Sequence, residues 1–198
     1  MFDAFVVGLG NPGREYAHSR HNVGEEAVVE VARRHGENLK ASRDSALTAD
    51  LTIRSSGASH RVLLVFPTTF MNESGQAVSK LMRRHGIRDI STLGDKFIVV
   101  QDELDLPPGT VRVKFGGGLG GHNGLRSITS HVGTQDYTRV RIGVGKPPSK
   151  EQGANHVLSR VPAAERKVLD VAVQVAADAI ESIIALGVDV TMNKFNSL

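Results

Sequence analysis

The chain has 198 residues, of which 40% are hydrophobic and 23% charged, and it contains no cysteine. These values suit one folded domain with a sizeable core, and they exclude disulfides, thiolate nucleophiles and cysteine metal sites. Lys and Arg number 24 against 21 Asp and Glu, and the net charge of +3 is too small to indicate nucleic-acid binding by itself. Because no apolar run of about 18 residues and no signal-like N-terminus occurs, we expect a cytoplasmic protein.

The first half of the chain repeats the order strand, loop, helix. An apolar run predicts the opening strand, and a helical pattern with acids early and bases late predicts the first helix. Two further runs, separated by a Ser/Gly turn, predict a hairpin. The expected elements are a strand at 5–7, a long polar loop from residue 8, a helix from 23 that ends before 36, strands at 46–53 and 61–66, and a helix with its apolar face at 77–82.

The second half adds three strands and a long helix. A continuous apolar run predicts a strand buried on both faces, and residues 146–155 lack periodicity and predict a mobile loop. Whether residues 146–160 close as a lid is left open. The expected elements are a strand at 96–100, an acidic loop at 101–109, a strand at 111–115, a glycine-rich loop at 116–124, a helix at 125–131, a strand at 138–144 and an amphipathic helix from 162 to 186.

No internal repeat and no linker divides the chain. We therefore expect an α/β fold that forms a single domain over residues 1–198. Its twisted mixed β-sheet would be flanked by helices, with a long C-terminal amphipathic helix.

The loop after the first strand formally matches a dinucleotide-binding fingerprint. Gly8-x-Gly10-x-x-Gly13 has the spacing, but no helix opens at once and no acidic residue ends a second strand about 20 positions later. The loop at 116–124 lacks the Gly-Lys-Ser/Thr ending of a phosphate loop. We expect no nucleotide cofactor.

Two histidines in the same loop raise the alternatives of a metal site and of a hydrolase with a serine nucleophile. His18 and His21 have no acidic neighbour at zinc-ligand spacing, and cysteine is absent, so we expect no metal. No Gly-x-Ser-x-Gly elbow exists, which leaves a serine hydrolase unsupported.

Polar residues follow several predicted strands. Asn11, His21, Asn72 and Asp102 each have an ordinary explanation as turn, cap or loop residues. Together they lie where open α/β sheets place a ligand crevice, at the carboxyl ends of strands. A histidine beside a carboxylate and neutral amides can activate water, so this set predicts metal-free hydrolysis.

Two predicted strands carry cations on one face. Arg112 and Lys114 alternate with apolar residues in one strand, and Arg139 and Arg141 do so in the other. Exposed charges are most often only solvated, so water-facing edge strands are the simpler interpretation and a phosphate-binding face is the alternative. With 5% aromatic residues, stacking of several bases on a sheet is not expected.

Four stretches spread over most of the chain stand in one family's order and spacing. They contain Gly-Leu-Gly-Asn-Pro-Gly and Ser-Arg-His-Asn-Val-Gly within 8–24, Phe-Met-Asn within 69–75, Asp-Glu-Leu-Asp-Leu-Pro within 102–109, and Gly-Gly-His-Asn-Gly within 116–125. On these motifs the sequence resembles the bacterial-type peptidyl-tRNA hydrolase family. It departs at Ser19, where Thr is usual, and at Gln101, where His is common.

The resemblance implies an esterase that hydrolyses the bond between a peptide and the 3′ end of tRNA. Such an enzyme recycles tRNA from prematurely released peptidyl-tRNA. By motif match, His21 is the general base for water and Asp102 is its orienting partner. Asn11 and Asn72 would hydrogen-bond the substrate or the water near the reacting carbonyl.

The resemblance also implies how the peptidyl-tRNA partner is held, by its acceptor end, its 5′ phosphate and the C-terminal part of the peptide. It implies no cofactor, and we expect a monomer. The substrate-binding residues would be Tyr16, Phe70, Asn72 and Asn123, and the clamp for the tRNA 5′ phosphate would be Lys114 and Arg141.

Two other functions stay open. A non-catalytic RNA-binding module could keep the same fold, but the presence of both His21 and Asp102 disfavours it. A hydrolase of small N-acylated esters would not need tRNA, and the cationic strands disfavour it.

Overall fold

A computed structural model describes all of residues 1–198. It contains both helices and strands, as the hydrophobic pattern predicts. The elements are β1 (Ala4–Gly8), α1 (Val23–Arg34), β2 (Lys40–Ala41), β3 (Ala46–Ser55), β4 (Ala58–Pro67), α2 (Ser74–Arg84), β5 (Phe97–Glu103), β6 (Val111–Phe115), α3 (Asn123–Val132), β7 (Thr138–Gly143), α4 (Gly153–Leu158), α5 (Ala163–Leu186) and α6 (Val188–Phe195).

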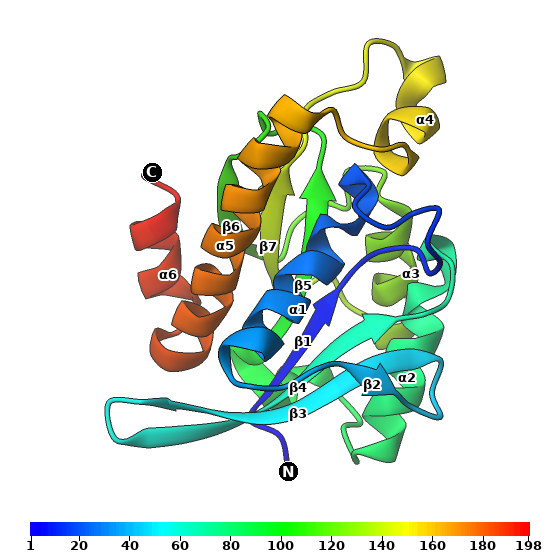
Figure 1. Cartoon of the computed structure of the whole chain (residues 1–198). Helices are drawn as coiled ribbons and strands as arrows, with labels where there is room; N and C mark the ends of the chain where they lie inside the picture. The colour runs from blue at the N-terminus through cyan, green and yellow to red at the C-terminus, as the bar shows by residue number, and fades with distance from the viewer.

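One seven-stranded sheet, in the order β2-β3-β4-β1-β5-β7-β6, forms the centre of the fold. The pairs among β4, β1, β5 and β7 are parallel, whereas β2–β3, β3–β4 and β6–β7 are antiparallel. Helices α1 and α5 cover one face and α2 and α3 cover the other, which confirms the expected mixed α/β fold (Figure 1). Neither the 24-residue α5 nor any shorter helix combines the length and apolarity that a membrane span requires.

The parallel strands are buried on both faces because apolar residues fill consecutive positions. Val6, Ile98 and Val140 pack beneath α1 and α5, whereas Val7 and Val99 pack beneath α2 and α3. Successive strand residues point to opposite faces, so an unbroken apolar run supplies both cores. The carboxyl ends of β1, β4 and β5 therefore meet at one edge, where their polar residues follow.

The structure corrects the prediction at three points. Strand β5 runs to Glu103, so residues 101–103 belong to the strand and the acidic loop begins after them. The segment expected as an aperiodic loop at 146–155 runs into α4 (Gly153–Leu158), which lies above the carboxyl edge of the sheet (Figure 1). After Gly187, whose φ of 88° ends α5, the unpredicted helix α6 packs Val188 and Phe195 into the core.

Candidate active site

A carboxylate held between two imidazoles is the centre of the site. Nδ1 of His21 lies 2.9 and 2.8 Å from the two carboxylate oxygens of Asp102, and Nε2 of His122 lies 2.7 Å from Oδ1. Asp102 is the residue before the end of β5 and is 3% exposed. The sequence predicts the first pair, but it does not predict His122, which comes from the glycine-rich loop.

Helix capping decides the tautomer of His122. Its Nδ1 accepts hydrogen bonds from the backbone N–H groups of Gly124 and Leu125 at the start of α3. Nε2 must then carry the ring proton and donate it to Asp102. His122 thereby holds the carboxylate from the side opposite His21.

The charge distribution prepares His21 to accept a proton. Burial opposes charge on Asp102, but His21, His122 and their hydrogen bonds hold its pKa far below the ordinary value. Burial also opposes protonation of His21, yet the Asp102 carboxylate and its hydrogen bond raise the pKa of His21 overall. With Nδ1–H donating to an ionised carboxylate, the neutral ring keeps a free lone pair on Nε2.

Asn11 is fixed in place by groups from two other segments. The side chain of Asn22 pairs with its backbone, accepting from Asn11 N and donating to Asn11 O, each at 2.9 Å. The Asn11 Oδ1 accepts from the backbone N–H of Met71 at 2.7 Å. The Asn11 Nδ2 has no hydrogen-bond partner within the protein, and Asn11, which is 7% exposed, is not among the residues that line the cavity described below. Asn22 stands beside His21 in the motif, and its role was not predicted.

The loop's glycines permit close packing within the protein. A Cβ on Gly8 would lie 2.4 Å from the carbonyl oxygen of Gly24, and one on Gly24 would lie 2.2 Å from that of Val100. A Cβ on Gly10 would lie 2.9 Å from Asn22 Cγ. Because glycine has no Cβ, α1 can begin directly against the sheet, and Asn22 can lie beside Asn11.

A cavity of about 230 Å³ opens beside the two histidines. His21 and Asp102 line its base, Asn123 lines it from the start of α3, and Ala154 and Val157 of α4 form the facing wall. Small and polar residues make up most of the lining, and Ala154 and Val157 of α4 give it an apolar part.

Comparison with known proteins identifies the family of this chain. A family model described as peptidyl-tRNA hydrolase matches residues 5–198. The chain belongs to the peptidyl-tRNA hydrolase family. Among its relatives are the peptidyl-tRNA hydrolases of Cutibacterium acnes, 47% identical over 199 residues with 97% of each chain covered, and of Leifsonia xyli, 47% identical over 192 residues with 97% of this chain and 96% of the relative covered.

A solved structure shares the fold over the same length. The crystal structure of peptidyl-tRNA hydrolase from Acinetobacter baumannii superposes with a TM-score of 0.86 at 37% identity, covering 100% of this chain and 96% of the other.

The other residues that the resemblance implies for substrate binding in this peptidyl-tRNA hydrolase family member lie farther apart. Asn123 is exposed and lines the cavity. Asn72 and Phe70 are exposed, and Tyr16 is half-buried, and all three lie outside the cavity's lining. Asn72 does not cap α2, because Glu73 occupies that position.

The cations of β6 and β7 share one face of the sheet. The strand register pairs Arg112 with Arg141 and Lys114 with Arg139. Arg139 is fully buried and donates to the backbone carbonyls of Gly117 and Gly118, so it anchors the glycine-rich loop rather than facing water. The simpler expectation of two solvated strands is wrong for this residue.

Lys114 and Arg141 are the cations left free on that face. Neither makes a side-chain hydrogen bond, and Arg141 has only Glu103 nearby, with 3.9 Å between Nη1 and Oε1. Burial, together with the charges of Arg141 and Arg139, lowers the pKa of Lys114. An anion placed between the two side chains would relieve this repulsion.

Arg20 ties the wall of the cavity to the loop that carries His21. Its guanidinium donates to both carboxylate oxygens of Glu165, at 3.1 and 2.8 Å, and to the carbonyl of His156 in α4 at 2.9 Å. A β-bridge between Ser19 and Arg160 adds a backbone contact. The segment at 146–160, whose role as a lid the sequence leaves open, is thus bound to Arg20, the residue before His21.

We predict that Arg20→Gln loosens α4. Removing charge-assisted hydrogen bonds worth about 1.5–3 kcal/mol each should speed amide exchange across Gly153–Leu158 by about tenfold or more, measured by hydrogen–deuterium exchange. Arg166→Gln is the matched control, because Arg166 also bridges from α5 to the N-terminal region but pairs with Glu26. Equal exchange of α4 in Arg20→Gln and wild type would show that Arg20 does not fasten it.

Proposed function

We propose that this family member cleaves peptidyl-tRNA by direct attack of a water molecule that His21 activates. The observation that carries the proposal is the His21–Asp102 pair at 2.8 Å, placed at the base of the cavity. An ionised, buried carboxylate that fixes the ring leaves Nε2 of His21 as the group able to take a proton.

In the proposed reaction, Nε2 removes a proton as water attacks the carbonyl carbon of the ester. The carbonyl electrons move to the oxygen, where the Nδ2 groups of Asn11 and Asn72 supply hydrogen bonds. Collapse of the tetrahedral intermediate breaks the bond to the ribose oxygen, which takes the proton back from His21. The products are tRNA with a free 3′ hydroxyl and a peptide carboxylic acid, which ionises by releasing its proton to solvent. Asn123, Tyr16 and Phe70 would contact the peptidyl end.

The side chains of His21, Asp102 and His122 also have the ligand types of a metal site. Ligand atoms of His21, Asp102 and His122 lie within 4.8 Å of one another. The sequence does not indicate this cluster, because its members are far apart along the chain. The capping of α3 by Nδ1 of His122 and the short bonds to Asp102 already account for the geometry without an ion. We keep metal-free hydrolysis as the proposal, and the assay below tests it.

One assay separates the candidate functions. The protein is incubated with N-blocked aminoacyl-tRNA in the presence and absence of a chelator, and released tRNA is measured beside release from a short N-acylated ester. We expect equal release of tRNA with and without chelator, and little turnover of the short ester. Loss of tRNA release with chelator would indicate a metal-dependent hydrolase. Equal turnover of both esters would indicate a hydrolase of small esters. No release of tRNA under either condition would indicate a binding module.

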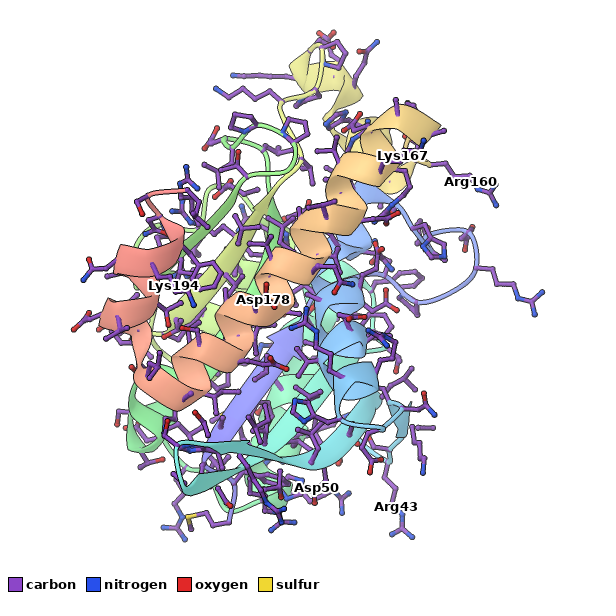
Figure 2. All side chains as sticks on the ribbon, turned by 60° about the vertical axis from the view of Figure 1, so that its left-hand side comes forward. Arg43, Asp50, Arg160, Lys167, Asp178 and Lys194 are labelled. Carbon is purple, nitrogen blue, oxygen red and sulfur yellow. The ribbon has the colours of Figure 1, made fainter.

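Lys114 and Arg141 are proposed to hold the 5′ phosphate of tRNA. We predict that Lys114→Ala weakens tRNA binding and reduces the slope of log Kd against log salt by about 0.7–0.9, the value of one phosphate contact. Arg43→Ala is the control, since Arg43 is exposed beyond β2, at the edge of the sheet opposite β6 (Figure 2). A salt slope that Lys114→Ala leaves unchanged would remove it from the clamp.

The proposed site also bears on assembly and location. We further propose a one-domain monomer as the working unit. Since peptidyl-tRNA arises at the ribosome, the proposed function corresponds to a cytoplasmic enzyme.

A further inference from the structure

The carboxyl end of β5 carries residues that face two different sites. Asp102 meets the two histidines, while its neighbour Gln101 points to the other face of the strand. Gln101 pairs in register with Arg141 on β7. One strand end therefore contacts both the proposed catalytic site and the proposed phosphate clamp.

Gln101 has one amide atom paired and one unpaired. It is 2% exposed, and its Nε2 donates to the backbone carbonyl of Asp102 at 2.8 Å. Its Oε1 is buried without a hydrogen-bond partner, and so is Nε of Arg141. Thus a buried acceptor and a buried donor, both unpaired, belong to register partners on the same face. Such pairs are rare in native proteins because each unpaired atom carries a free-energy penalty.

No hydrogen bond holds the Arg141 side chain in its present orientation. Its head makes no hydrogen bond, and the 3.9 Å contact to Glu103 is a weak, partly exposed ion pair. A phosphate between Lys114 and Arg141 would draw the guanidinium away from Glu103. In turning, Nε can donate to Oε1 of Gln101, directly or through one water molecule.

We propose that Gln101 is a positioning residue that couples phosphate binding at Arg141 to the orientation of Asp102. When the clamp is filled, Gln101 is held at both ends, by Arg141 and by the Asp102 backbone, so the carboxylate that fixes His21 becomes better ordered. The tRNA 5′ phosphate then raises the rate of ester cleavage as well as the affinity. This inference rests on the proposed clamp.

The test compares two substrates and two variants. The substrates are N-blocked aminoacyl-tRNA with its 5′ phosphate and the same tRNA dephosphorylated, and the measured quantity is the ratio of their kcat values. We expect the ratio to exceed one in wild type and to fall by about fivefold or more in Gln101→Met, which keeps the length of the side chain but cannot hydrogen-bond. Gln101→His, which restores a donor and an acceptor, should stay near the wild-type ratio.

Thr138→Val is the matched control. Thr138 is fully buried on β7, and its hydroxyl donates to the backbone carbonyl of Asp95 at 2.7 Å, away from the clamp. A purely structural loss should lower kcat for both substrates alike and leave the ratio unchanged, as expected for this control. If Gln101→Met also lowered kcat for both substrates alike and left the ratio unchanged, the proposed coupling through Gln101 would be wrong, while the proposed phosphate clamp would still stand. A wild type whose kcat and KM both ignore the 5′ phosphate would overturn the clamp and the coupling together.

A measurement on the wild-type protein keeps the proposal testable if Gln101→Met does not fold. The side-chain NH₂ resonances of Gln101 are followed by NMR as an acceptor-stem RNA is added, either with or without its 5′ phosphate. We expect these resonances to move only with the phosphorylated RNA. Equal movement with both RNAs, or none with either, would overturn the proposal.

Discussion

His21→Ala should lower kcat by about 10²–10⁴-fold or more while the protein stays folded. General base catalysis typically contributes this range, and no other side chain in the cavity offers a free lone pair held by an ionised carboxylate. Alanine leaves space at the base of the cavity, so substrate should still bind. The measurement is single-turnover release of tRNA, with thermal unfolding to establish that the fold is intact.

His18→Asn is the matched control for that result. His18 lies three residues earlier in the same loop, but its side chain is 76% exposed against 12% for His21. Its φ of 63° is one that asparagine tolerates, so the control introduces little backbone strain. We expect wild-type turnover from it. A His21→Ala enzyme that works within about threefold of wild type would assign the proton transfer to another group.

Much of the site could be predicted because its residues follow parallel strands. The apolar runs of β1, β4 and β5 are unambiguous, and parallel strands bring their carboxyl ends together whatever loops intervene. His21 and Asp102 therefore meet as expected across 81 positions. Their distance apart in the chain did not matter, since the sheet supplies the geometry.

The unpredicted parts depend on contacts that have no period. Nε2 of His122 faces Asp102 because Nδ1 of the same ring caps α3. A single histidine in a glycine-rich loop does not predict this capping or the contact with Asp102. The alternation in β7 shows that Arg139 and Arg141 share a face, but backbone carbonyls of the folded loop decide that only Arg139 is covered. Helix α4, with six residues, is too short for a helical pattern to be recognised.

The pH profile of the reaction gives the second large prediction. His21 must be neutral to take a proton from water, and the Asp102 carboxylate raises its pKa above 6.5 despite burial. Activity should therefore rise with pH along a limb centred above 6.5 and then level off. In Asp102→Asn the charge is gone and burial remains, so the limb should move to lower pH. The plateau should also fall by on the order of 10²–10⁴-fold, because the ring loses the partner that fixes its tautomer.

These two effects have opposite consequences at low pH, which makes the test specific. A variant that merely disturbs folding would lose activity at every pH and keep the position of the limb. Asp105→Asn removes a nearby but exposed carboxylate that pairs with Lys146, and it should leave both the limb and the plateau in place. If Asp102→Asn kept the wild-type limb, the charge of Asp102 would not set the pKa of His21, and its role would reduce to holding the ring by hydrogen bonds.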